Sequence, residues 1–150
     1  METGIFGAGC FWKPDLEFAK LKGVKKTEVG YCGGNNSNTN YEKVCTGTTN
    51  HAEVVKVYYN ENIISYEELL IFFFKIHDPT TLNSQGPDVG TQYRSEIFYT
   101  KEKQKEIAEK TIEKVNKEFK GKIVTKVSKE SNYCKAEDYH QKYLEKKGVL

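Results

Sequence analysis

Near its start the chain runs Gly4-Ile5-Phe6-Gly7-Ala8-Gly9-Cys10-Phe11-Trp12, which is an apolar segment, a glycine turn, a cysteine and two large aromatic rings. The apolar segment predicts a buried strand that ends at the glycine turn. The apolar residues after Trp12 recur at helical intervals, which is typical of an amphipathic helix. Cys10 is therefore expected at a helix N-terminus, where unpaired N–H groups and the helix dipole favour a thiolate.

Two interpretations of this cysteine stay open on these residues alone. A nucleophilic sulfur beside the rings of Phe11 and Trp12 would suit an enzyme that acts on a small apolar group. Alternatively, Cys10 is a buried structural cysteine, and the two rings belong to the hydrophobic core. Residues elsewhere in the chain have to decide between a catalytic and a structural cysteine.

Composition limits the class of protein. The chain has 150 residues and a formal net charge of +2, which suits a single domain with its own hydrophobic core. Acidic and basic residues nearly balance, and no basic cluster alternates with stacking aromatics, so nucleic acid is not an expected partner. No apolar segment approaches a membrane span, and no secretory leader precedes the first strand. We expect a cytoplasmic protein whose cysteines rest as thiols.

The four cysteines are Cys10, Cys32, Cys45 and Cys134. None belongs to a Cys-x-x-Cys pair or has a histidine at zinc-ligand spacing, so no metal site is predicted. The glycines before Cys10 also fail the dinucleotide-binding fingerprint, because Trp12 occupies its third glycine position. The catalytic interpretation is therefore a lone nucleophile without a bound cofactor.

Beyond the first helix the chain alternates between strand and helix patterns. Strands are predicted at 24–31, 52–59, 93–99 and 123–128, and helices at 66–76, 101–120 and 136–146. Ser65 and Glu68 form a capping box that opens helix 66–76, while the polar stretch 35–40 predicts a loop. The alternation indicates an α/β domain, and no linker or internal repeat divides residues 1–150.

Glu53 begins a strand face that is otherwise apolar. With the two-residue period of a strand, it shares that face with Val55, Val57 and Tyr59. A carboxyl group desolvated there would have a raised pKa and could act as a general acid near neutral pH. The alternative is that Glu53, at the end of the strand, points into water or pairs with a lysine. His51 is a second polar candidate on the same face.

Six separated blocks of the chain follow a family pattern in order: Gly9-Cys10-Phe11-Trp12, Gly30-Tyr31 with Gly33-Gly34, Tyr41-Glu42-Lys43-Val44-Cys45-Thr46-Gly47, His51-Ala52-Glu53-Val54-Val55, Gly86-Pro87-Asp88-Val89-Gly90-Thr91-Gln92-Tyr93-Arg94-Ser95 and Ala136-Glu137-Asp138-Tyr139-His140-Gln141. In these blocks the sequence resembles the peptide methionine sulfoxide reductase A family. The resemblance implies an α/β fold, a two-layer sandwich with a mixed sheet and flanking helices in a ferredoxin-like arrangement. It also implies a single catalytic domain over residues 1–150.

The resemblance further implies an oxidoreductase that reduces the S epimer of methionine sulfoxide, free or in proteins, to methionine. A sulfoxide sulfur is a poor electrophile until its oxygen accepts a proton. The family pattern therefore makes Glu53 the acid and Cys10 the nucleophile. Release of methionine would leave Cys10 as a sulfenic acid.

Further residues match the family site. Tyr41 and Tyr93 match tyrosines that hydrogen-bond the substrate oxygen as charge develops on it. Phe11 and Trp12 match the rings that hold the S-methyl group of the substrate. Asp88 matches a pocket residue that orients water, the peptide or neighbouring donors.

Two departures from the family pattern affect the expected chemistry. Lys13-Pro14 follows the aromatic pair where glycine is common, and the lysine charge is expected to lower the pKa of Cys10. The sequence ends at Leu150 without the glycine-rich C-terminal tail in which many relatives carry resolving cysteines. Some relatives also encode selenocysteine at the position of Cys10.

We therefore expect a one-cysteine cycle in which an external thiol, such as glutathione or a glutaredoxin, reduces the sulfenic acid. Thioredoxin and dithiothreitol are further candidate reductants. The competing hypothesis is an internal disulfide from Cys10 to a resolving cysteine, for which the candidates are Cys134, Cys32 and Cys45.

Other classes of function fit less of the pattern. A thiol peroxidase would also form a sulfenic acid, but it needs neither a methyl-binding aromatic pair nor a proton-donating carboxyl group. A Cys/His hydrolase would need a histidine placed by a motif beside the sulfur, and His51, His77 and His140 show none. A non-catalytic module could bind oxidised methionine in the same aromatic pocket.

Overall fold

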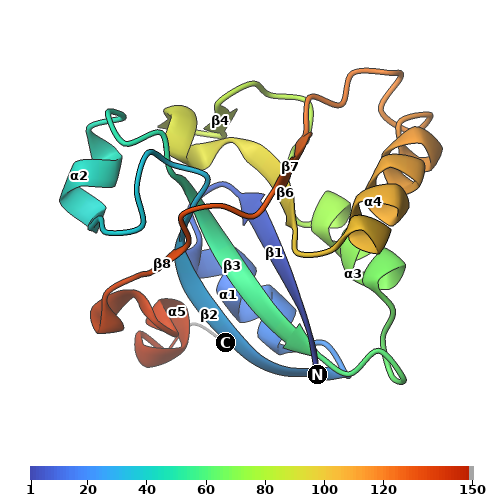
Figure 1. Cartoon of the computed structure of the whole chain (residues 1–150), viewed down its shortest axis with the longest axis horizontal. Coiled ribbons are helices and arrows are strands. Elements are labelled where there is room, and N and C mark those ends of the chain that lie inside the picture. The colour runs from blue at the N-terminus through green and yellow to red at the C-terminus, as the bar shows by residue number, and fades with distance from the viewer. Residues whose placement is uncertain (149–150) are drawn as a thin grey trace.

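The computed structural model describes residues 1–148, and its elements follow one another from the N-terminus as shown in Figure 1. The strands and helices are β1 (Glu2–Ala8), α1 (Trp12–Ala19), β2 (Val24–Cys32), α2 (Tyr41–Cys45), β3 (Ala52–Tyr59), α3 (Tyr66–Lys75), β4 (Ser84–Gln85), β5 (Asp88–Val89), β6 (Ser95–Tyr99), α4 (Glu102–Val115), β7 (Lys126–Lys129), β8 (Cys134–Lys135) and α5 (Tyr143–Lys146). Two 3₁₀ turns, η1 (Thr91–Tyr93) and η2 (Asp138–His140), lie between them. In the described part of the chain, no helix has the length and apolar character that crossing a membrane requires.

The main sheet has the strand order β7-β6-β1-β3-β2-β8. Its strands pair antiparallel except β6 and β7, which are parallel, so the sheet is mixed. The segment β1-α1-β2-β3-α3-β6 places its strands in the order β6-β1-β3-β2, which is the ferredoxin-like arrangement. The expected α/β fold with flanking helices is confirmed.

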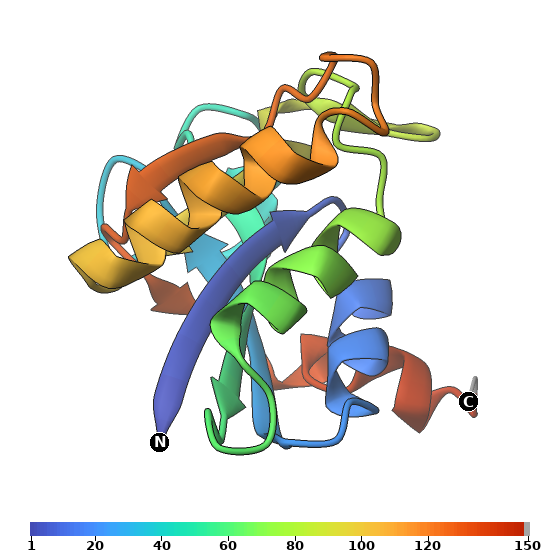
Figure 2. The ribbon, with the colours of Figure 1, turned by 90° about the vertical axis from the view of Figure 1, so that its right-hand side faces the viewer.

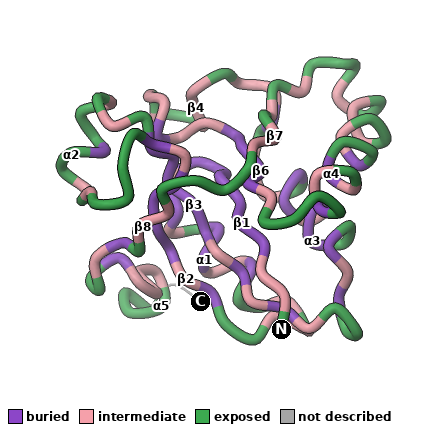
Figure 3. The backbone as a smooth tube through the Cα atoms, in the orientation of Figure 1, coloured by how far each residue is buried: buried purple, intermediate pink, exposed green. Residues whose placement is uncertain are grey.

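Helices α1, α3 and α4 cover one face of this sheet (Figure 2). Phe6 of β1 lies at the centre of the resulting core, with its ring 5.1 Å from Phe18 of α1 and 5.5 Å from Phe73 of α3. The capping box opens α3 as predicted, because Ser65 accepts the Glu68 N–H and Glu68 accepts the Ser65 N–H. Figure 3 shows the buried residues concentrated on the central strands, with the more exposed α4 at the right of the view.

A second, smaller core lies on the opposite face of the sheet. Ile5, Val54 and Phe98 project from that face, and Tyr133 packs across them. The chain between β7 and β8 crosses this face in front of the strands (Figure 1). Neighbouring residues of one strand therefore project into different cores, because successive side chains point to opposite faces of the sheet.

Several predicted boundaries were wrong. The predicted helix 136–146 is instead the turn η2 and the short helix α5, preceded by β8, and Lys142 between η2 and α5 has a left-handed backbone with φ of 54°. Helix 101–120 begins at Glu102 and ends at Val115, strand 93–99 begins at Ser95, and strand 123–128 lies at 126–129. Helix α2 was not predicted at all.

Polar side chains explain why residues 136–146 do not form one helix. The Gln141 amide accepts the Val29 N–H at 2.9 Å and donates to the Val29 carbonyl at 2.9 Å and the Ala136 carbonyl at 3.1 Å. The buried Asp15 carboxylate of α1 accepts the Lys142 backbone N–H at 3.0 Å and its ammonium at 3.2 Å. These bonds hold the segment in an extended and turning path across α1 and β2.

Gln141→Glu is expected to destabilise the fold by about 1–3 kcal/mol, because a carboxylate cannot donate to the two carbonyls and would face them unpaired. The midpoint of urea unfolding measures the change. Asn62→Asp, the same amide-to-acid change at an exposed position, is the control and should leave the midpoint nearly unchanged. Equal effects of the two substitutions would contradict this role of Gln141.

Candidate active site

Cys10 lies in the bend between β1 and α1. Gly9 precedes it with φ of +89°, a backbone conformation that favours glycine. The Gln85 side chain packs over this glycine so closely that a Cβ there would lie 2.7 Å from the Gln85 Cγ. The Gln85 amide is itself hydrogen-bonded to the Asp78 backbone, and these bonds fix the Gln85 side chain over Gly9. The sequence therefore needs a glycine directly before the cysteine.

The environment of Cys10 keeps its sulfur protonated. Burial raises the pKa of the thiol to about 11, the Trp12 backbone N–H lowers it only in part, and the charges of Glu53 and Asp88 raise it further. The prediction of a lowered pKa was therefore wrong. Its physical reason is that Cys10 precedes the capping residue Phe11, and desolvation outweighs both the helix terminus and the exposed Lys13.

Glu53 lies on the helix-covered face of β3 with only 1% of its surface exposed. Its Oε1 accepts the Phe11 N–H at 3.2 Å, while its buried Oε2 has no hydrogen-bond partner among the described residues. Desolvation raises the pKa of the carboxyl group to about 8, the Phe11 N–H offsets this partly, and the Asp88 charge adds to it. The carboxyl group is therefore largely protonated at neutral pH, as predicted for a buried position on an apolar face.

The charge of Glu53 affects the pKa of two tyrosines. Burial raises the pKa of Tyr93 to about 12, and the charges of Glu53, Cys45, Asp88 and Cys10 raise it as well. Burial also raises the pKa of Tyr41, as does the Glu53 charge. Both hydroxyls therefore stay protonated and are available as hydrogen-bond donors.

Each tyrosine is held by a different device. Tyr93 ends the turn η1, which follows the β4–β5 hairpin that carries Asp88. Tyr41 begins α2, and its backbone N–H donates to Glu137 at 3.0 Å. The other oxygen of Glu137 accepts the Tyr31 hydroxyl at 2.8 Å, so the C-terminal segment helps to place Tyr41.

The aromatic pair after Cys10 packs against the C-terminal segment. Phe11 is buried, with its ring 5.1 Å from His140 and 5.7 Å from Tyr31. Trp12 stacks on Tyr143 with ring centres 3.8 Å apart, and its indole N–H donates to His140 Nδ1 at 3.0 Å. The two rings form an apolar wall beside the sulfur.

His140 and Glu137 are site residues that sequence reasoning missed as such. Both belong to the block Ala136–Gln141, which pointed to the family without assigning a role to any residue. Because His140 Nδ1 accepts from Trp12, the ring proton is on Nε2. Burial lowers the pKa of His140, so the ring is neutral at neutral pH. His51 also lies outside the predicted role, since its buried ring bonds the Asn36 carbonyl at 2.8 Å and packs on Gly34.

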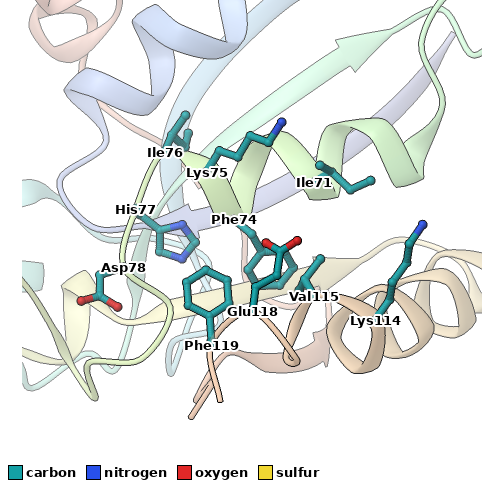
Figure 4. A pocket seen from close by; sticks show the side chains of 10 residues that line it. All are labelled: Ile71, Phe74, Lys75, Ile76, His77, Asp78, Lys114, Val115, Glu118 and Phe119. Carbon is teal, nitrogen blue, oxygen red and sulfur yellow. The ribbon is translucent and has the colours of Figure 1, made fainter. Parts of the chain in front are cut away.

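A wide groove of the described structure lies away from these residues. It has a volume of about 910 Å³ between α3 and the end of α4, where Ile71, Phe74, Val115 and Phe119 face one another (Figure 4). None of the predicted site residues lines it. No group of side chains suited to a metal ion occurs within residues 1–148.

Comparison with known proteins agrees with this geometry. The family model described as "Peptide methionine sulfoxide reductase" matches residues 2–149. The chain belongs to this family. The MsrA of Pelagibacter ubique is 63% identical over 98% of this chain and 100% of that protein. The crystal structure of reduced Mxr1 from Saccharomyces cerevisiae is similar with a TM-score of 0.95, at 38% identity over 99% of this chain and 87% of that one. Mxr1 in complex with Trx2 matches at 26% identity with a TM-score of 0.68, over 95% and 84%.

The protein is thus an oxidoreductase, a peptide-methionine (S)-S-oxide reductase that reduces methionine sulfoxide to methionine with a thiol as electron donor. A thiol peroxidase and a non-catalytic module are set aside by this membership.

The other three cysteines of the reductase lie at different distances from Cys10. Cys32 is buried in the smaller core on the opposite face of the sheet. Cys134 pairs with Tyr31, which pairs with Glu53, so it shares the catalytic face but lies three strands from β1. Cys45 is exposed, and its charge contributes to the raised pKa of Cys10.

Glu53→Gln is expected to stabilise the reductase at neutral pH by on the order of a few kcal/mol. Between the ordinary pKa of 4.5 and the folded value of about 8, the unfolded chain has lost the Glu53 proton and the folded chain retains it. Stability contributed by this group therefore falls as pH rises through that window, and glutamine removes the dependence. Urea unfolding from pH 4.5 to 8.5 measures it. Parallel curves for wild type and variant would contradict the assignment.

Proposed function

We propose that Cys10 attacks the sulfur of methionine sulfoxide while Glu53 donates a proton to its oxygen. The observation that carries this assignment is the buried Glu53 Oε2, which has no partner in the described structure although Oε1 is bonded. When protonated, this oxygen is a buried hydrogen-bond donor that has no acceptor in the described structure. The sulfoxide oxygen is such an acceptor.

The protons balance within the pair. In the resting site both the thiol and the carboxyl group hold a proton at neutral pH. As Glu53 gives its proton to the sulfoxide oxygen, the resulting carboxylate takes the thiol proton and Cys10 becomes nucleophilic. The attack forms a bond between the Cys10 sulfur and the methionine sulfur. The hydroxyl then passes from the methionine sulfur to the Cys10 sulfur as this S–S bond breaks, so that Cys10 becomes a sulfenic acid and methionine leaves. Glu53 is then protonated again.

The remaining residues receive supporting roles in this proposal. Tyr41 and Tyr93 donate hydrogen bonds to the sulfoxide oxygen as negative charge develops on it. Phe11 and Trp12 hold the S-methyl group, and the packing of these rings against His140 and Tyr143 supports this role. Asp88 orients the donors at the mouth of the site, where its charge already reaches Cys10 and Glu53.

We further propose a one-cysteine cycle in which an external thiol reduces the Cys10 sulfenic acid. The positions of Cys32 and Cys134 support this, since Cys32 lies in the core on the opposite face of the sheet and Cys134 lies on β8, three strands from β1. Thioredoxin is a candidate donor because the related Mxr1 forms a complex with Trx2. Glutaredoxin and glutathione, in a cytoplasmic setting, are the other candidates. Cys45 is the residue through which the cycle could instead close internally.

The assigned residues predict a graded loss of turnover with a methyl aryl sulfoxide and dithiothreitol. Cys10→Ser should abolish sulfide formation, and Glu53→Ala should lower kcat by roughly a hundredfold or more. His140→Ala should mainly raise KM, since His140 supports Trp12 and lies away from the reacting oxygen. Full activity of the Glu53 variant would remove it as the acid. Peroxide consumption without sulfide formation would favour a thiol peroxidase.

Counting free thiols after one equivalent of sulfoxide tests the cycle. We expect the loss of one thiol per chain, with a sulfenic acid on Cys10 that dimedone traps and mass spectrometry locates. Cys45→Ser is the matched control and should lose one thiol as well. Loss of two thiols in the wild type but one in the variant, with a Cys10–Cys45 disulfide by mass, would replace the one-cysteine cycle by an internal one.

A further inference from the structure

The turn η1 that carries Tyr93 has little regular structure to hold it. It is a single 3₁₀ turn closed by two bonds, from the Tyr93 N–H to the Gly90 carbonyl at 3.0 Å and from the Arg94 N–H to the Thr91 carbonyl at 3.2 Å. Short 3₁₀ turns have poor bond geometry and do not persist by themselves. A further contact has to fix the position of the tyrosine hydroxyl.

The Arg94 guanidinium provides that contact by joining two segments of the site. Its Nη1 donates to the Thr91 carbonyl at 2.9 Å, inside the turn that ends with Tyr93. Its Nη2 donates to the Asn50 carbonyl at 2.9 Å, three residues before Glu53. One planar group therefore bridges the backbone that carries the tyrosine and the backbone that leads into the acid.

The guanidinium is itself anchored in the protein. Its Nε donates to Glu96 at 2.6 Å, and the Glu96 side chain is only 3% exposed. The second carboxylate oxygen of Glu96 accepts the Ser128 hydroxyl at 2.6 Å. Both oxygens of the buried carboxylate are thus occupied, and the arginine is fixed from strand β6.

The glycine pair after Tyr31 makes room for this arrangement. A Cβ at Gly33 would lie 3.2 Å from Arg94 Nη2 and 2.6 Å from the Phe98 ring, and its φ of +78° also favours glycine. A Cβ at Gly34 would overlap the ring of His51, the residue after Asn50. The glycines accordingly leave space for the side chain and the loop that Arg94 connects.

We propose that Arg94 is a positioning residue that fixes Tyr93 relative to Glu53 by bonding the Thr91 and Asn50 carbonyls at once. The inference rests on the proposed function for the role of Tyr93. Lysine cannot replace arginine here. Its single ammonium group, when paired with Glu96, cannot also bond the Thr91 and Asn50 carbonyls, whereas the planar guanidinium has donors for all three.

A double-mutant cycle tests whether Arg94 acts through Tyr93. Arg94→Lys, which retains a charge beside Glu96, should lower kcat/KM for the sulfoxide roughly tenfold to a hundredfold. In the Tyr93→Phe background the same substitution should cost less than about threefold, because the two residues belong to one network. Lys101→Gln, which breaks an exposed ion pair with Glu2, is the control and should change kcat/KM by less than about twofold. Equal losses from Arg94→Lys in both backgrounds would overturn the proposal.

A second measurement requires no turnover and so separates this inference from the proposed function. The phenol of Tyr93 is titrated by NMR with ¹³C-labelled tyrosine, the signal being assigned by Tyr93→Phe. Its pKa of about 12 should fall towards the ordinary value of 10 in Arg94→Lys, because the freed turn lets the ring reach water. An unchanged titration would overturn the proposal even if the wild type reduced no sulfoxide. If Arg94→Lys does not fold, Glu96→Gln enters both measurements, with a smaller effect expected in the same direction.

Discussion

The bond from the Phe11 N–H to Glu53 Oε1 joins the two parts of the site that the chain places 42 residues apart. It draws the end of β1, and with it Cys10, onto the helix-covered face of β3. It also occupies one carboxyl oxygen and leaves the other without a partner in the described structure. The burial that holds the bond is the same burial that raises the pKa of both groups. Position and protonation state therefore have a common physical origin in the packing of α1 over the sheet.

The C-terminal segment completes the site from the opposite side. Asp15 and Gln141 fix this segment against α1 and β2, at the expense of helical regularity. Once fixed, it supplies Glu137 to the start of α2 and His140 to the indole of Trp12. The position of the site residues thus depends on polar contacts between residues more than 90 positions apart in the sequence. The sheet brings these distant parts of the chain together.

The sequence predicted those features that depend on residues close together in the chain. The period of β3 placed Glu53 on an apolar face, and the capping box set the start of α3, because both signals lie within a few residues. The helix predicted at 136–146 failed because its competing partners, Asp15 and Val29, lie more than a hundred positions away. The pKa of Cys10 was predicted in the wrong direction because a helix terminus is visible in the sequence, whereas burial is a property of the folded site.

The family resemblance supplied Tyr41, Tyr93 and Asp88, which no local pattern would have selected. Their roles remain proposals that rest on the charges and burial around them.

Trp12 is the only tryptophan of the chain, and it lies stacked on Tyr143 and bonded to His140 rather than in the main core. Its fluorescence is consequently an intrinsic signal from the apolar wall that Phe11 and Trp12 form beside Cys10. Emission from this residue is expected to follow the docking of the C-terminal segment and, under the proposed function, the binding of a sulfoxide beside the ring. The protein therefore carries a single tryptophan, which serves as a fluorescent probe beside Cys10 with no label required.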